Sequence, residues 1–298
     1  MKKILVVGLS GESVFMNTDH FNENDETIQA DSIHIEPGGK GFNQCVAVKR
    51  LSDYEVHYLT MVGNDNYKNE CKNFLKKEKI KTHFIVHPTE KTAYAAIVTD
   101  KNGTSRITVY PGASSKLEEK HILKYEKLIS KMDLVLIQLE LGIDVVNTIL
   151  DMCNKYSIPV VLNPAPVSKN IDFEILKKAT VLTPNTHEAR IIFNYEESST
   201  IEEIISSIKN QTNQTVIVTL GSKGALLVSE KESILIPTDK KTPVDTTGAG
   251  DVFNGAFVSK YFENIEIKEK IIFANKAASY SVMKKYVMDS IPHILEVK

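Results

Sequence analysis

The sequence is poor in arginine, in cysteine and in long hydrophobic runs, and each shortage excludes some functions. The 298 residues include only three arginines, Arg50, Arg106 and Arg190. An anion bound by this chain must therefore be held largely by lysine and by backbone N–H groups. The three cysteines show no metal-ligand spacing and are too few for a dense disulfide framework, so we expect a reducing compartment, the cytoplasm.

Membrane and nucleic-acid partners are not expected either. The sequence has no run of about 18 apolar residues. The apolar segment 4–8 is too short for a signal peptide and predicts a buried first strand. The 36 basic and 38 acidic side chains give a formal net charge of −2, without the positive excess that captures nucleic acid or anionic lipid. A small-molecule partner is therefore favoured.

Composition and pattern predict a globular α/β fold. Apolar residues make up 42% and charged residues 25% of the chain, which excludes collagen-like and disordered chains. Short, almost wholly apolar runs predict parallel strands buried on both faces, at 4–7, 56–61, 134–137, 160–162, 181–182 and 216–219. Helical patterns lie between them, at 41–51, 66–79, 116–130, 143–156 and 200–210. This alternation is typical of α/β proteins.

Two stretches break that alternation and predict a small lid. Segments 93–99 and 105–110 flank Asn102-Gly103, a strong β-hairpin signal. Segment 19–36 is polar with scattered isoleucines, as an edge strand or exposed sheet would be. No low-complexity linker separates these stretches from the rest. We therefore expect one domain, residues 1–298, with a β-sheet lid formed by about 12–37 and 92–112 inserted in it.

The segment Asp245-Thr-Thr-Gly-Ala-Gly-Asp251 is the sharpest local signal. It precedes an apolar, helix-periodic stretch at 252–261. Small residues that open a helix leave backbone N–H groups unpaired, and the helix dipole adds positive potential, so the segment predicts an anion hole. Asp251 is placed to take a proton from a hydroxyl that attacks a bound phosphoryl group. Taken alone, the segment is equally typical of a glycine turn with a helix-start aspartate.

A second glycine cluster spans Pro37 to Gln44. Its three glycines allow a ligand to approach the backbone closely, and Lys40 and Asn43 can donate hydrogen bonds to polyol oxygens. A flexible turn with a solvated lysine would look the same. The spacing matches neither the phosphate-binding P-loop nor the dinucleotide fingerprint, which disfavours P-loop and NAD enzymes.

Further polar groups follow predicted strands, where open parallel sheets bind ligands. These segments are Gln138-Leu139-Glu140, Asn163-Pro164-Ala165-Pro166, Pro184-Asn185-Thr186-His187-Glu188 and Gly221-Ser222-Lys223-Gly224. Asn185 and Glu188 can hold waters around a magnesium ion, which prefers oxygen ligands. Each segment alone is also typical of a helix cap or turn.

Together these segments resemble the ribokinase-like sugar kinases of the phosphofructokinase-B family over essentially the whole chain. Gly38-Gly39-Lys40-Gly41-x-Asn43-Gln44 resembles the family's amino-terminal signature. Asp245-Thr246-Thr247-Gly248-Ala249-Gly250-Asp251-x-Phe253-Asn254-Gly255 resembles the carboxy-terminal one. The segments Asn163–Pro166, Thr183-Pro184-Asn185-x-x-Glu188 and Thr219-Leu220-Gly221-Ser222-x-Gly224 match in the same order.

The resemblance implies a doubly wound sheet with a β lid, ATP-dependent phosphorylation of a sugar hydroxyl, and homodimers joined through the lids. Asp251 would be the base, with the anion hole at Gly248, Ala249 and Gly250. Asn185 and Glu188 would organise Mg²⁺ and the phosphates through water. The sugar would be held by Gly39, Lys40, Asn43, Glu140 and Asp251. The nucleotide would be held by Asn185, Thr219, Gly221, Ser222, Gly224, Gly250 and Asn275, the last near the adenine.

Two departures from ribokinases leave the substrate and the cation open. Ribokinases carry an Asn and an Asp that grip the sugar hydroxyls where this chain has Gly11 and Ser13. Glu12 is adjacent, but a shift of one residue on a strand faces the other way. Nucleoside kinase and a non-catalytic ligand-binding protein therefore stand as alternatives. Tyr286 replaces a glycine in the segment that helps ribokinases bind a monovalent cation, so K⁺ activation stays open.

Overall fold

The computed structural model describes residues 1–297, and its larger sheet has nine strands. Their order is β13-β12-β11-β10-β9-β8-β1-β4-β5. Neighbours from β5 to β11 pair in parallel, and β12 and β13 add an antiparallel edge. The strands are β1 (Lys3–Val7), β4 (Glu55–Gly63), β5 (Lys81–His87), β8 (Leu134–Gln138), β9 (Val160–Asn163), β10 (Val181–Leu182), β11 (Thr215–Thr219), β12 (Ala225–Val228) and β13 (Ser233–Ile236).

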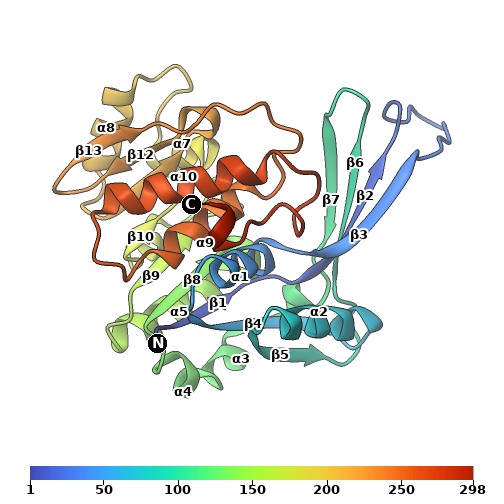
Figure 1. The fold of residues 1–298 in the computed structure, drawn as a ribbon. Coiled ribbons are helices and arrows are strands. Elements are labelled where there is room, and N and C mark those ends of the chain that lie inside the picture. Colours follow the sequence, from blue (N-terminus) through green and yellow to red (C-terminus); the bar gives the residue numbers. More distant parts are fainter. Residues whose placement is uncertain (298) are drawn as a thin grey trace.

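Helices cover both faces of this sheet (Figure 1). One face carries α1 (Lys40–Arg50), α2 (Asn66–Lys77), α9 (Ala249–Ser259) and α10 (Ile267–Ser281). The other carries α3 (Glu119–Leu123), α4 (Glu126–Ile129), α5 (Ile143–Lys155), α6 (Phe173–Leu176), α7 (Thr186–Phe193) and α8 (Ile201–Lys209). The expected doubly wound, mostly parallel architecture is confirmed.

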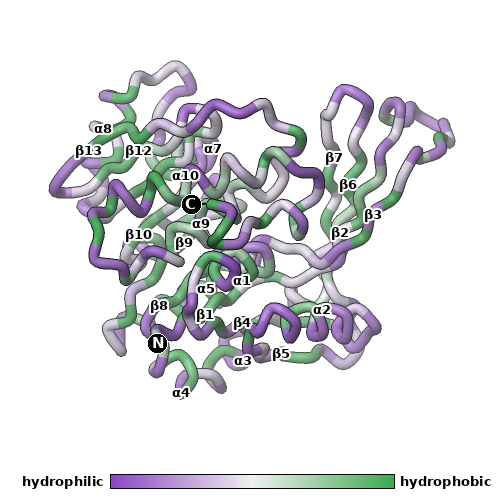
Figure 2. The backbone as a smooth tube through the Cα atoms, viewed as in Figure 1, coloured by the Kyte–Doolittle hydropathy of each residue, from purple (hydrophilic) through white to green (hydrophobic). Residues whose placement is uncertain are grey.

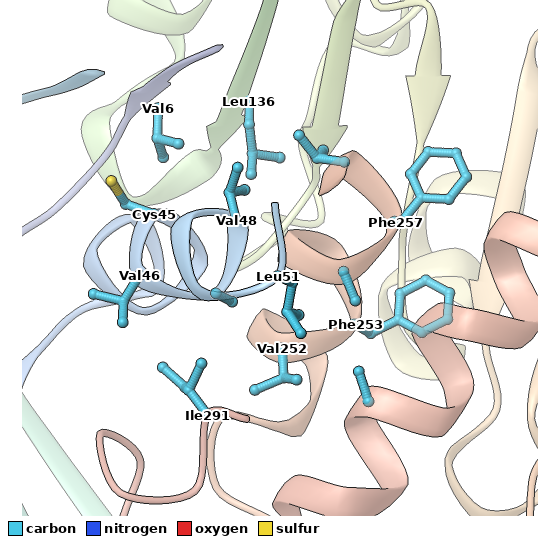
Figure 3. Close-up of a cluster of buried hydrophobic side chains, with 14 of the residues drawn as sticks. Val6, Cys45, Val46, Val48, Leu51, Leu136, Val252, Phe253, Phe257 and Ile291 are labelled. Atoms are coloured by element: carbon cyan, nitrogen blue, oxygen red, sulfur yellow. The ribbon is translucent and has the colours of Figure 1, made fainter. Parts of the chain in front are cut away.

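Successive residues of β1 supply both hydrophobic cores. Ile4 and Val6 face α1 and α9, whereas Leu5 and Val7 face the opposite helix layer, because side chains alternate along a strand. Figure 3 shows the first core, in which Val6 points from the sheet toward α1. Burying one such side chain stabilises the fold by about 1.5–3 kcal/mol. These cores fix α1 and α9, the two helices that carry the candidate site.

A separate four-stranded sheet, here called the lid sheet, projects from the body (Figure 1). Its order is β3-β2-β6-β7, with β2 (Gly11–Asn17), β3 (Ser32–Gly38), β6 (Ala93–Thr99) and β7 (Ser105–Tyr110). The turns at its far end are hydrophilic (Figure 2). Since β2 follows β1 closely and β3 leads into α1, the lid sheet joins the body beside the carboxyl end of β1.

Every strand that the sequence predicted in the body is present, but two other predictions need correction. Residues 116–130 do not form one helix: α3 and α4 are separated at Tyr125, whose amide bonds three residues back to Ile122. Within 19–36, only the last part, from Ser32, is a strand. No helix among residues 1–297 is long and apolar enough to cross a membrane.

Candidate active site

Asp251 lies in the first turn of α9 and is held by the first turns of α1. Asn43 donates from Nδ2 to one carboxylate oxygen at 2.8 Å, and Gln44 donates from Nε2 to the other at 2.9 Å. The residue is only 7% exposed. Burial raises the pKa of Asp251 above its ordinary value, opposed by Lys40 and the two amides. A fixed carboxylate with a raised pKa is suited to general-base chemistry near neutral pH.

Two buried side-chain amides at strand ends, those of Gln138 and Asn163, hold Gln44 in turn. Gln138, the last residue of β8, donates to Gln44 Oε1 at 2.6 Å. Gln44 Nε2 also lies 3.1 Å from Asn163 Oδ1 at the end of β9, and Asn163 donates to the carbonyl of Thr183, just after β10, at 2.9 Å. The orientation of the Asp251 carboxylate is therefore set by the carboxyl edge of the sheet.

Lys40 supplies the positive charge of the site. Its backbone N–H donates to Glu140 Oε2 at 3.0 Å. The negative charge of Asp251 raises the pKa of the Lys40 ammonium, and Glu140 and Glu188 add to the effect. Burial raises the pKa of Glu140 to about 7, with Lys40 opposing and Asp251 adding to the rise. Glu140 is therefore partly protonated at neutral pH, which lessens the negative charge around Asp251.

The start of α9 presents backbone donors beside that carboxylate. Gly248 precedes the helix with φ 77°, and a Cβ there would lie 2.7 Å from Cγ1 of Val287. The amides of Gly250 and Asp251 have no acceptor within the helix because they belong to its first turn. Together with the helix dipole they form a site that favours an anion.

A cavity of about 310 Å³ opens at the amino end of α9, between β11 and α10. Six residues that the sequence analysis assigned to the nucleotide line it: Thr219, Gly221, Ser222, Gly224, Gly250 and Asn275. Ala249 lines it as well. Asn275 donates to the carbonyl of Ile236 at 3.1 Å and so fixes the wall at the end of β13. Six of the seven residues predicted to hold the nucleotide thus surround one space at the start of α9, whereas Asn185 is not part of its lining.

Asn185 and Glu188 form a capping box at the start of α7. Glu188 N–H donates to Asn185 Oδ1 at 2.9 Å, and Asn185 N–H donates to Glu188 Oε2 at 2.8 Å. The backbone of Asn185 also forms an isolated parallel β-bridge with Thr219, which lines the cavity. Within residues 1–297 no three His, Cys, Asp or Glu side chains lie close enough together to hold a metal directly. Glu188 is buried and interacts electrostatically with Lys40 and Asp251. A single carboxylate of this kind suits Mg²⁺, which binds few protein ligands alongside water and phosphates.

Comparison with known proteins shows which family the chain belongs to. Residues 1–294 match the family described as pfkB family carbohydrate kinase. The chain belongs to this family. The expected carbohydrate kinase is therefore confirmed.

Individual relatives match this pfkB-family kinase from end to end. It is 34% identical over 298 residues to the ribokinase of Bacillus subtilis strain 168, covering 100% of this chain and 99% of the relative. The crystal structure of ribokinase from Thermotoga maritima matches with a TM-score of 0.89 at 34% identity, covering 100% of this chain and 98% of that one. Arabidopsis thaliana ribokinase, solved with ribose and ATP, shares the fold with a TM-score of 0.85 at 24% identity, covering 99% and 97%. The ribokinase-like fold is confirmed.

The departures of this pfkB-family kinase have local structural reasons. A Cβ on Gly11 would lie 2.9 Å from the carbonyl oxygen of Ala93 on β6, so a larger side chain there requires the lid sheet to shift. The Ser13 hydroxyl lies so close to Gly38 that a Cβ on that glycine would be 2.2 Å from Ser13 Oγ. Tyr286 has φ 64°, so the loop keeps a conformation that glycine favours although its side chain is large.

Sequence reasoning missed the supporting shell of the kinase site. Gln44 and Gln138 were noticed only as members of motifs, yet Gln44 donates to Asp251 and Gln138 donates to Gln44. Glu36 was overlooked although it is 6% exposed and accepts from two backbone N–H groups, at Val287 and Met288. Its only signal in the sequence was a carboxylate placed directly before the glycine cluster.

Proposed function

We propose that this protein transfers the γ-phosphoryl group of ATP to a hydroxyl of a small sugar, with Asp251 as the general base. One observation carries the proposal. The buried carboxylate of Asp251 is oriented by Asn43 and Gln44 and stands in the helix turn whose amides form the anion hole. Base and phosphoryl site are therefore adjacent, as in-line transfer requires.

In this proposal, each element has a separate task. Gly39, Lys40, Asn43 and Glu140 hold the sugar, so that its reacting hydroxyl faces Asp251. Asp251 accepts the hydroxyl proton as the oxygen attacks the γ-phosphorus and the bond to ADP breaks. The amides after Gly248, together with Lys40, stabilise the charge that spreads over the transferred phosphoryl oxygens. With three arginines in the chain, these backbone donors take the place of guanidinium clamps.

The nucleotide and its cations belong to the cavity. ATP would lie along Thr219, Gly221, Ser222 and Gly224 with its base toward Asn275, which is supported by their common cavity. Mg²⁺, held through water by Asn185 and Glu188, would neutralise phosphate charge when bound. Potassium enters the assay as a variable, because the loop at Tyr286 keeps the backbone conformation of a glycine.

The proposal extends to assembly and location. We propose a homodimer joined through the lid sheets, because Ile107 and Val109 alternate along β7 on one face and are 57% and 55% exposed. A second copy covering this face of β7 would remove the two apolar side chains from water. Cytoplasmic location stays a prediction from the cysteine content.

A screen of the purified protein tests the proposal. ATP consumption is followed with ribose, other pentoses, fructose, sugar phosphates and nucleosides, each with and without K⁺. We expect turnover with free sugars. Turnover confined to nucleosides would establish the nucleoside kinase alternative, which Gly11 and Ser13 keep open by removing two expected sugar anchors. ATP binding without turnover across the panel would favour the non-catalytic alternative.

A further inference from the structure

Glu36 joins the lid sheet to the carboxy-terminal loop. It lies on β3 and is 6% exposed. One carboxylate oxygen accepts the Val287 N–H at 2.8 Å, and the other accepts the Met288 N–H at 3.2 Å and lies 3.2 Å from His34 Nε2. Bonds from successive backbone amides to one buried carboxylate are charge-assisted and fix two chain segments in register.

Tyr286 adds a second contact between the same segments. Its ring stacks on His34 of β3 with centroids 3.8 Å apart and planes inclined by 14°. It also meets Phe15 of β2 edge-on at 5.4 Å. The residue holds φ 64°, a conformation that costs a non-glycine residue free energy, and these aromatic contacts offset that cost.

The far side of this loop contacts the anion hole. Asp245 accepts the Tyr286 N–H at 3.1 Å on one oxygen and the Thr247 N–H at 2.9 Å on the other. Val287 fills the space beside Gly248, where a Cβ would lie 2.7 Å from its Cγ1. Residues 286–288 therefore contact β3 on one side and residues 245–248 on the other.

The same strand leads directly into the residues assigned to the sugar. Glu36 is followed by Pro37 and the glycines that open α1, so a displacement of residues 38–43 also displaces the carboxylate that holds the loop. We propose that Glu36 and Tyr286 are positioning residues that couple the sugar-binding end of β3 to the anion hole. The coupling makes sugar binding raise the affinity for nucleotide, an inference that rests on the proposed function.

Binding titrations test this coupling. The dissociation constant of the ATP analogue AMP-PCP is measured with and without ribose, or another sugar that the screen identifies. We expect ribose to raise nucleotide affinity at least about fivefold in the wild type, a typical coupling. The coupling ratio is the dissociation constant of AMP-PCP without ribose divided by the one with ribose. We expect this ratio to fall below about twofold in two variants. Glu36→Gln loses one of the two N–H acceptors, and Tyr286→Gly loses the ring but suits the backbone conformation.

Two controls accompany these variants. Glu26→Gln removes the charge of another lid carboxylate that contacts a histidine, His20 at 3.0 Å, but not the loop, so its ratio stays at the wild-type value. Tyr286→Phe keeps the stacked ring and restores coupling. Steady-state assays of Glu36→Gln should show a lower kcat with a smaller change in the KM for sugar. An undiminished ratio in Glu36→Gln and Tyr286→Gly overturns the inference.

Hydrogen exchange of the ligand-free protein separates this inference from the proposed function. Glu36→Gln should speed amide exchange in 286–288 and also in 246–251. Faster exchange in 286–288 alone would refute the link to the anion hole, whether or not any sugar binds. If Glu36→Gln fails to fold, Tyr286→Gly undergoes the same test. A wild type that binds no sugar contradicts the proposed function and leaves the exchange result to decide the link.

Discussion

Glu140→Gln tests the electrostatics of the site through protein stability. Burial raises the pKa of Glu140 from 4.5 to about 7 in the folded protein. An acid whose pKa is raised by folding binds more protons folded than unfolded, so its contribution to stability is present below the unfolded pKa and is lost as pH rises through the folded pKa. The wild type should therefore lose stability from this group between about pH 4.5 and pH 7.

The magnitude follows from the size of the shift. A rise from 4.5 to about 7, at about 1.4 kcal/mol per pKa unit, corresponds to at most about 3 kcal/mol. Glutamine keeps an acceptor for the Lys40 N–H but cannot ionise. The variant should match the wild type near pH 4.5 and exceed it by up to about 3 kcal/mol above pH 7, a melting temperature difference of roughly 6 °C at about 2 °C per kcal/mol.

Urea unfolding of both proteins from pH 4.5 to pH 8.5 measures this difference. Other groups titrate in both proteins, so their effects largely cancel when one curve is subtracted from the other. Glu230→Gln, at an exposed position, is the matched control and should give a flat difference curve. A flat difference curve for Glu140→Gln, or one that falls with pH, would refute this account of the site.

Three further predictions concern the anion hole, the substrate and the assembly. Gly248→Ala places a Cβ at φ 77° and 2.7 Å from Val287 Cγ1, so it should cost about 1–3 kcal/mol in urea unfolding and lower kcat at least about tenfold; wild-type values for both would contradict the role of this turn. Ser13→Asp returns a carboxylate for sugar hydroxyls and should raise kcat/KM for ribose about tenfold or more, and an unchanged value counts against Ser13 as a specificity residue. Ile107→Lys combined with Val109→Lys should convert a dimer into monomers in light scattering, whereas a persistent dimer would place the interface elsewhere.

Much of the body could be predicted because its strands are buried on both faces. Runs such as 134–137 and 160–162 are apolar throughout, a pattern that surface elements do not show. Three strands of the larger sheet were not predicted. These are β12 and β13, which form its antiparallel edge, and β5, whose first three residues, Lys81, Thr82 and His83, are polar and follow a lysine-rich helix end. The proposed helix at 116–130 failed because apolar spacing does not reveal the tight turn at Tyr125.

The candidate site, too, was predicted only in part from the sequence. Asp251 and the glycines of its turn lie in one continuous segment, so local spacing predicted an anion hole there, although a glycine turn with a helix-start aspartate fitted the same spacing equally well. The partners of Asp251 come from α1, 208 and 207 residues away along the chain, and only the fold brings them together. Glu36 and Tyr286 have no shared motif, and their contact depends on how the lid sheet packs against the carboxy-terminal loop. Such long-range contacts cannot be obtained from spacing along a sequence.

The most direct test of the proposed mechanism is the turnover of Asp251→Asn with the sugar that the screen identifies. Asparagine keeps the size of the side chain and one acceptor for Asn43 or Gln44 but cannot take up the hydroxyl proton. The proposal predicts that kcat falls roughly a hundredfold or more while AMP-PCP still binds. Near wild-type turnover in this variant would show that Asp251 is not the base.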